Sequence, residues 1–210
     1  MRVILDNETC SIEAQNLGEA LAAASHLAED QGRLVVEVLV DGNPLTDAQL
    51  REDSILEDSV SEIQLKTTTA AQLLFETFSD ASAAILDTQK VQHNAAELIQ
   101  SSQSEQGMRA LGVALASWGE IHEAMVKGLL LAGEDPETMT IGEHSFMDAS
   151  KALQNQLSEL RNAIEAQDAS AMCDCLLYEF PPVCESWANM LRLLAERYDS
   201  SGTEHSEGGS

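Results

Sequence analysis

The sequence predicts an α+β protein, with a small N-terminal sheet and one helix followed by an antiparallel four-helix bundle. As far as about Thr68, apolar residues come in short, β-branched runs bounded by turn residues, which is typical of strands. From residue 69 they recur every three or four positions over long stretches, which is typical of helices packed along their length. The predicted parts are therefore residues 1–67, residues 69–198 and a disordered polar tail at 199–210.

The chain begins with a predicted hairpin and one helix. "MRVIL" and "TCSIEA" are the expected strands, joined at residues 6–8, where Asp-Asn-Glu tolerates tight-turn geometry. Asn16 stands at the N-cap position of the helix and Gly32 at its C-terminal end. The helical spacing between them is carried by Leu17, Leu21, Ala24 and Leu27.

Two more strands complete the predicted sheet. "LVVEVLV" is a β-branched run suited to a central strand, and Asp41-Gly42 ends it with a turn. "TDAQLRED" predicts a short polar helix capped by Thr46, and "VSEIQLKT" predicts the final strand. Because "KTTTAA" is too short for a free linker, we expect this strand to feed directly into the first long helix.

This order, with "VLVDGNPLTDAQLREDSILEDSVSEIQLKT" after the helix, resembles the ubiquitin-like β-grasp fold. The resemblance implies a sheet that packs over one helix, and it implies little about function. Conjugation to other proteins is not expected, because the last strand runs into a helix and Gly208-Gly209 lies in the polar tail. A Rossmann fold is excluded, because no glycine-rich turn joins the first strand and helix.

Four apolar stripes predict the bundle. The first runs from Leu74 to Ile99, the second from Met108 to Ala132, the third from Phe146 to Ile164 and the fourth from Cys173 to Tyr198. Gly133 and Pro136 should end the second helix, and "EAQDAS" should break the chain before the fourth. The short connections favour antiparallel neighbours.

Charge and composition narrow the functional classes. The formal net charge is -25, from 36 acidic and 11 basic residues, which disfavours nucleic acid and anionic membranes as partners. A basic protein partner is compatible with this charge, as is the ordinary role of acidity in solubility. No signal peptide and no run of about 20 apolar residues is present, and four unevenly spaced cysteines suit a reducing compartment. We therefore expect a cytoplasmic protein.

The cysteines and histidines are the residues that could bind a metal or cofactor, but their spacing favours structural roles. Cys173 and Cys175 would point about 160° apart on a helix, so a metal pair there requires a broken helix. None of the five histidines follows a glutamate by three residues, which removes the ferritin-type motif. We expect no catalytic residue, no metal ligand and no cofactor.

Two anomalies supply the candidate binding residues. His122 falls on the apolar stripe of the second helix and would face a polar layer with Thr88 and Gln92, which either fixes helix register or lines a ligand pocket. In "YEFPPVCESW", two prolines interrupt the fourth stripe, so we expect a kink or a helix restart. The alternative is a binding site around this break. The candidate residues are Trp118, His122, Tyr178, Glu179 and Trp187.

Two functional hypotheses follow. The first is a non-catalytic adaptor or chaperone-like protein whose bundle groove binds a basic or helical partner or another copy of the chain. The helical part resembles small bacterial secretion and flagellar chaperones, which are also acidic helical bundles. The second hypothesis is a small-ligand or metal-binding sensor built around His122 and the proline break. An exposed apolar groove favours the first, and an enclosed pocket lined by Trp118, His122 and Tyr178 favours the second.

Overall fold

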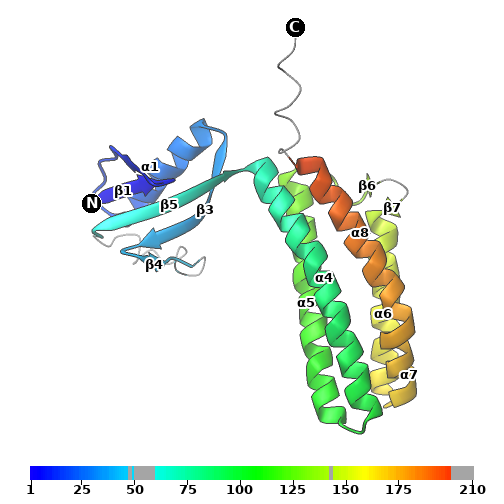
Figure 1. Ribbon diagram of the computed structural model, residues 1–210. Helices are drawn as coiled ribbons and strands as arrows, with labels where there is room; N and C mark the ends of the chain where they lie inside the picture. Colours follow the sequence, from blue (N-terminus) through cyan, green and yellow to red (C-terminus); the bar gives the residue numbers. More distant parts are fainter. Residues whose placement is uncertain (47–48, 50–59, 142–143, 200–210) are drawn as a thin grey trace. The chain divides into compact units, whose positions relative to one another are not determined.

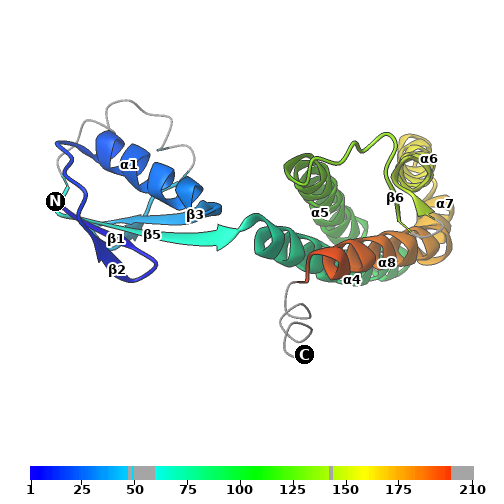
Figure 2. The same ribbon diagram turned by 90° about the horizontal axis from the view of Figure 1, so that it is seen from above.

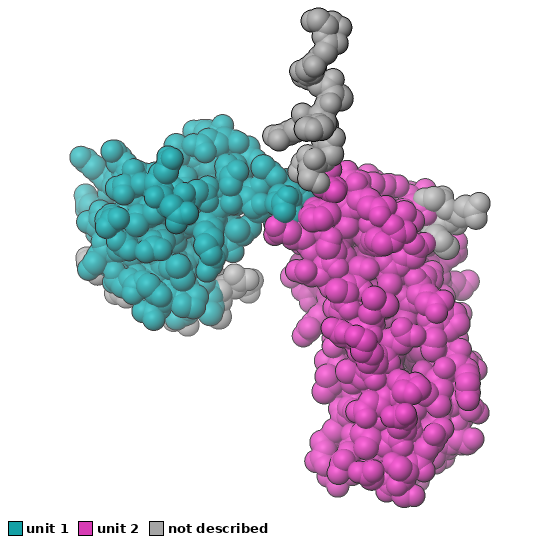
Figure 3. Space-filling model, viewed as in Figure 1, with its two compact units in different colours: residues 1–73 teal, residues 74–210 magenta. Residues whose placement is uncertain are grey.

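The computed structural model confirms an α+β protein and describes residues 1–46, 49, 60–141 and 144–199. A sheet with one helix comes first and a mostly helical region follows (Figures 1 and 2). The chain divides into two compact units, residues 1–73 and 74–210 (Figure 3), called here the N-terminal unit and the helical unit. Strand β5 (Glu62–Thr69) is followed without a spacer by helix α4 (Ala70–Gln100), as predicted.

The predicted hairpin is formed by β1 (Arg2–Leu5) and β2 (Glu8–Cys10). Its two central residues, Asp6 and Asn7, have φ angles of 49° and 69°, which is the geometry of a type I′ turn. The second strand is shorter than predicted and ends at Cys10, because β1, the only strand it pairs with in the described sheet, is itself four residues long.

Helix α1 (Leu17–Asp30) begins and ends at the predicted residues. Its first turn is capped by Asn16, whose Oδ1 accepts a hydrogen bond from the Glu19 amide at 2.8 Å. Gly32 follows the last turn with φ 68°, a conformation that glycine adopts without strain. The buried face of the helix packs on the sheet through Leu17, Ala20 and Ala24.

The sheet has the order β2-β1-β5-β3-β4, so the last strand lies in its centre. Strand β5 is parallel to β1 and antiparallel to β3 (Arg33–Val40). A type I′ turn at Asp41 and Gly42, with φ angles of 47° and 81°, joins β3 to β4 (Asn43–Pro44). Strand β4 was not predicted, because it is too short to show an alternating pattern.

The predicted helix in "TDAQLRED" lies outside the described residues, of which this stretch contains only Thr46 and Gln49. There the Gln49 amide donates to Thr46 Oγ1 at 3.4 Å, and the Gln49 side chain accepts from the Thr46 amide at 3.0 Å. This reciprocal arrangement is a capping box, which agrees with the expected cap at Thr46. The predicted polar tail from residue 200 also lies outside the described residues.

The described residues of the helical unit form five α-helices and one π-helical segment. They are α4, α5 (Ser104–Leu131), α6 (Phe146–Glu165), α7 (Ala169–Asp174), the π-helical segment η1 (Cys175–Glu179) and α8 (Phe180–Tyr198). Residues of every helix share one apolar core. The predicted fourth rod is therefore divided into α7, η1 and α8.

Local signals set the ends of these helices. Helix α5 ends before Gly133, whose φ is 72°, as expected from the sequence. Pro181 and Pro182 lie in the first turn of α8, and the expected kink or restart is replaced by a π-helical turn, η1, in a helical backbone that continues through Glu179 and Phe180. A two-stranded hairpin, β6 (Thr140–Ile141) and β7 (His144–Ser145), was not predicted; it places Ile141 in the core between α5 and α6.

Candidate functional site

Helices α4 and α5 lie side by side, and glycine residues permit the close approach (Figures 1 and 2). At one end a Cβ on Gly107 would lie 2.9 Å from the Ala95 carbonyl oxygen. At the other end a Cβ on Gly128 would lie 2.6 Å from the Phe78 ring. Both distances are shorter than real Cβ contacts, so side chains at these positions would push the helices apart.

Between these two glycines, α4 and α5 form an exposed groove of about 300 Å³. Ala81 and Ile121 are buried at its floor, and Ala84 and Ala124 are half-buried beside them. Small side chains therefore line most of the groove, which leaves room for another backbone to come close. The full lining is Thr77, Asp80, Ala81, Ala84, Ser117, Glu120, Ile121 and Ala124.

Two carboxylates flank this α4–α5 groove. Asp80 and Glu120 are exposed, one on each helix, and no described residue forms an ion pair with either. The same face of α5 continues at helical spacing to Val113 and Leu131, which are 58% and 45% exposed. This face of α5 thus extends over roughly 27 Å, at 1.5 Å per residue, and combines the apolar Val113, Ala124 and Leu131 with Ser117, Glu120 and Lys127, which pairs with Glu123.

Three of the five residues proposed from the sequence come together inside the helical unit. The rings of Trp118 and Trp187 meet edge to face with centroids 5.8 Å apart, and His122 lies 6.0 Å from Trp187. Phe146, which the sequence analysis did not propose, completes the cluster at 5.9 Å from His122 and 5.8 Å from Trp187. His122 is half-buried rather than at the core position predicted for it, which Ile121 occupies.

Buried polar groups surround this aromatic cluster. Gln92 is fully buried and its Oε1 accepts a hydrogen bond from the Cys184 thiol at 3.5 Å. The Trp187 indole donates to the Ala149 carbonyl at 3.1 Å. Three buried polar atoms have no hydrogen-bond partner among the described residues, namely Gln92 Nε2, Trp118 Nε1 and Ser150 Oγ. Of the three residues of the predicted polar layer, Thr88 and Gln92 are buried, whereas His122 is half-buried.

The remaining candidates lie elsewhere. Tyr178 and Glu179 belong to η1, and Tyr178 is 71% exposed, with no ring contact to the aromatic cluster in the described residues. The two cysteines around η1 also have different hydrogen-bond partners. Cys173 Sγ donates to the Ala96 carbonyl, whereas Cys175 Sγ donates to the Gln156 carbonyl. The predicted divergence of the two thiols is present.

Burial makes the thiols poor nucleophiles and poor metal ligands. It raises the pKa of Cys175 to about 11 and that of Cys184 to about 12, so both remain protonated near neutral pH. In the part of the chain that the structure describes, no group of three or more histidine, cysteine, aspartate or glutamate side chains is placed to hold a metal ion. None of the described helices has a stretch long and apolar enough to cross a bilayer.

Comparison with known proteins gives one match. Residues 89–190 match the model of a family described as a domain of unknown function, DUF8042. The matched range lies within the helical unit and includes the groove residues of α5 and the whole aromatic cluster, but not the groove residues of α4. No curated protein and no solved structure matches the chain.

Proposed function

We propose that this protein is a non-catalytic adaptor whose α4–α5 groove binds an amphipathic helix with basic residues that flank its apolar face. The observation that carries the proposal is the groove itself, lined by small side chains and flanked by Asp80 and Glu120. A helix docks through residues spaced three and four apart, and small residues in the receiving groove allow its backbone to approach. Uncompensated carboxylates at the edge favour lysine or arginine on the incoming helix.

The dimensions of the groove support a helix as the occupant. The face of α5 from Val113 to Leu131 covers nineteen residues of helix, so a partner helix of about five turns would match it. The helical unit then acts as an antiparallel four-helix bundle in which α7, η1 and α8 form the fourth rod. The hydrogen bond from Ser82 Oγ to the Ala188 carbonyl, at 3.0 Å, joins α4 to that rod on a side that the groove does not use.

The N-terminal unit, in this proposal, is a β-grasp module attached to the bundle. Its support is the described sheet, which packs on α1 and has β5 at its centre. An acidic chain of net charge -25 would attract a basic partner from solution and would repel nucleic acid.

The test uses two synthetic helical peptides of eighteen residues that share an alanine-leucine face. One carries lysine on its flanks and the other carries glutamate at the same positions. Calorimetric titration of the full chain should show binding of the lysine peptide and its weakening as salt is raised, because ions screen the carboxylates. Absence of binding by the lysine peptide, or equal binding of both peptides, contradicts the proposal.

Variants of groove residues test whether the lysine peptide binds in the α4–α5 groove. Ala84→Gln with Ala124→Gln fills the groove with longer side chains and should weaken the lysine peptide by about tenfold or more. Ala152→Gln, at an exposed alanine of α6, is the control and should leave binding unchanged. Glu120→Lys should weaken binding severalfold, whereas the same change at the exposed Glu159 of α6 should have little effect. If the groove and control variants lose affinity equally, another surface binds the helix.

A second function, a small-ligand sensor, is favoured by the three buried polar atoms beside the aromatic cluster. Gln92 Nε2 and Trp118 Nε1 are donors, so a ligand with hydrogen-bond acceptors, or ordered water, would satisfy them. Two pockets found in the helical unit are lined by other residues and include neither His122 nor Tyr178. The adaptor proposal is therefore the better supported. A rise in melting temperature with a metabolite, in a protein that binds no helix, would reverse this order.

A further inference from the structure

The two edges of β3 differ in how they are paired. One edge pairs with β5 along its length, from Arg33 opposite Thr69 to Val40 opposite Ile63. On the other edge β4 covers only Leu39 and Val40, and one further bond joins the Leu45 amide to the Val38 carbonyl at 2.9 Å. Among the described residues, no strand pairs with this edge at residues 33–37. No described strand therefore uses the backbone donors and acceptors of this edge at residues 33–37.

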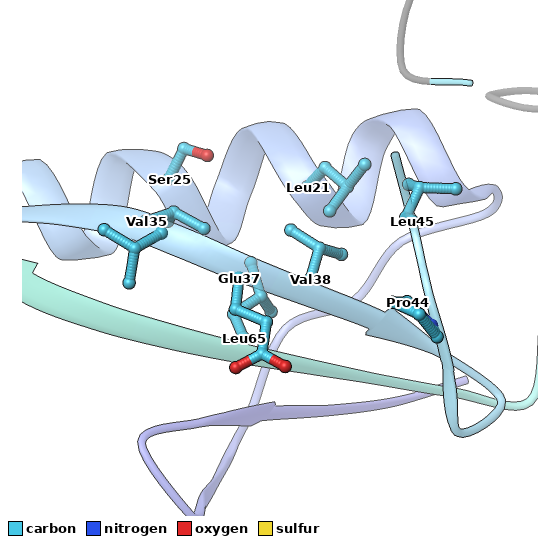
Figure 4. Close-up of a pocket in the computed structure, with 9 residues that line it drawn as sticks. Leu21, Ser25, Val35, Glu37, Val38, Pro44, Leu45 and Leu65 are labelled. Atoms are coloured by element: carbon cyan, nitrogen blue, oxygen red, sulfur yellow. The ribbon is translucent and has the colours of Figure 1, made fainter. Parts of the chain in front are cut away.

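A pocket of about 330 Å³ lies beside this open edge, between α1 and β3. Figure 4 shows Leu21 and Ser25 of α1 on one side, Val35 and Val38 of β3 on the other, and Leu45 near one end. Most of these side chains are apolar. A peptide strand placed along β3 would direct every second side chain toward this pocket.

Val36 is an exposed apolar residue in the middle of this open edge. The register between β3 and β5 shifts between Val35 and Glu37, so Val36 is the extra residue of a β-bulge. Its side chain lines the pocket and is 48% exposed. Proteins guard open edges with charges, prolines or bulges; here the bulge presents an apolar, β-branched side chain, and the neighbouring charge, Glu37, pairs with Lys66 of β5.

Charge indicates which strand would fit. The described residues of the N-terminal unit carry nine carboxylates and three basic side chains. Each basic side chain already has an acidic partner, in the pairs Arg2–Glu62, Arg33–Asp6 and Lys66–Glu37. The surplus is therefore negative. Apart from Asp30, which pairs with His26, it has no lysine, arginine or histidine partner among the described residues of this unit, so an incoming strand gains from lysine or arginine.

We infer that the open edge of β3 is a second docking surface, which binds an extended protein segment with alternating apolar side chains and basic flanking residues. The segment adds to the sheet as a strand, with main-chain hydrogen bonds to β3 and apolar side chains in the pocket. This inference goes beyond the helix-binding groove and does not depend on it.

The test uses the full chain and a blocked nine-residue peptide in which valine and threonine alternate between terminal lysines. Nuclear magnetic resonance should show the amides of residues 34–37 that face away from β5 exchanging rapidly in the free protein and becoming protected on binding. A peptide N-methylated at every second residue lacks the edge donors and should bind at least about tenfold more weakly. A peptide with glutamate in place of lysine should also bind more weakly.

Matched variants locate the site. Val36→Glu should reduce affinity for the strand peptide by about tenfold or more, because a carboxylate would enter the apolar contact. Leu86→Glu makes the same change at a residue of α4 that is 47% exposed, and should have no effect. Neither variant should alter binding of the lysine helix to the α4–α5 groove, which separates failure of this inference from failure of the proposed function.

Three outcomes would overturn the inference. Slow exchange of the edge amides in the free protein would mean that the chain itself covers the edge. Undiminished binding by Val36→Glu would place the peptide elsewhere. Protection that grows with protein concentration and without peptide would make a second copy of the chain the occupant.

Discussion

The two units differ in how their cores are filled. All eight aromatic residues of the protein, from Phe75 to Tyr198, lie in the helical unit, and residues 1–73 contain none. The helical core is built on interlocking rings such as Trp118 and Trp187, whereas the N-terminal core consists of aliphatic side chains and alanines. Aromatic rings bury large areas and have preferred contact geometries. The N-terminal unit should therefore depend more on each aliphatic residue and on polar links between its strands.

Because both tryptophans lie in the helical unit, tryptophan fluorescence reports on the unfolding of that unit alone. Unfolding followed by tryptophan fluorescence should describe that unit, and amide resonances of β1 and β5 should describe the other. A substitution in one unit should change the signal of that unit alone, unless the two units unfold together.

The largest effect is expected for Ile63→Ala in the N-terminal unit. Ile63 is fully buried on the central strand, and such a truncation costs about 2–5 kcal/mol, a large share of the stability of a small unit. The amide resonances of the sheet should collapse at low urea while the fluorescence midpoint stays in place. Ile85→Ala, at a fully buried isoleucine of α4, is the counterpart that should move the fluorescence midpoint. A fluorescence shift with Ile63→Ala would show that the units unfold together.

Gly128→Ala should weaken the helical unit by about 1–3 kcal/mol through the clash of its new methyl group with Phe78. Gly119→Ala, on the same helix and with no atom within 4 Å of its Cβ position, should instead stabilise by about 0.5–1 kcal/mol. Urea unfolding followed by fluorescence measures both. Equal gains from the two substitutions would mean that α4 and α5 can separate freely.

Asp6→Asn should weaken the N-terminal unit by about 1 kcal/mol at neutral pH. The Asp6 carboxylate accepts hydrogen bonds from the Thr67 amide and hydroxyl, and the hydroxyl bond contributes most to lowering its pKa below 3.8. Because the folded state favours the charged form, this stabilisation is present above about pH 4 and disappears as the pH falls through the lowered pKa. The wild-type and variant curves should therefore converge in acid. If the difference in unfolding free energy between wild type and Asp6→Asn stayed constant down to pH 2, the loss of stability would come from altered packing or geometry and not from the lost charge.

The smallest effect is expected for Gln92→Leu. The substitution removes a buried amide nitrogen without a partner in the described core and also the acceptor of the Cys184 thiol. A thiol is a weak donor, so we expect a gain of up to about 1 kcal/mol, measured by urea unfolding. A loss of more than about 2 kcal/mol would show that the amide is satisfied in solution, as it would be by buried water.

Features of the fold that depend on local chemistry were predictable from the sequence. Asn16 caps α1, Gly32 and Gly133 follow helices with positive φ, and the prolines at 181 and 182 begin α8. Each signal acts within one turn of chain, so it can be recognised without knowledge of the rest. The strands β4, β6 and β7 were missed because two residues cannot show a period.

The candidate site was less predictable because it depends on which helices meet. The spacing of α5 allowed either Ile121 or His122 to face the core, and the position of α4 decides in favour of Ile121. In the sequence, Ala84 and Ala124 are indistinguishable from other helix-forming alanines. Only the packing of α4 against α5 shows that they line one groove. The aromatic cluster was predicted in part, since Trp118 and Trp187 lay on apolar stripes, but Phe146 gave no separate signal.

The π-helical segment bears on how the chain tolerates changes of length. The Phe180 amide bonds to the carbonyl of Cys175, five residues back, where an α-helix would use a residue four back. One surplus residue is thereby absorbed within a single turn. A deletion inside this segment should convert it to regular α-helix and re-phase the side chains before it by about 100° relative to those of α8. Relatives of this chain that differ by one residue here can thus keep the same tail of the last helix while presenting a different set of side chains from α7.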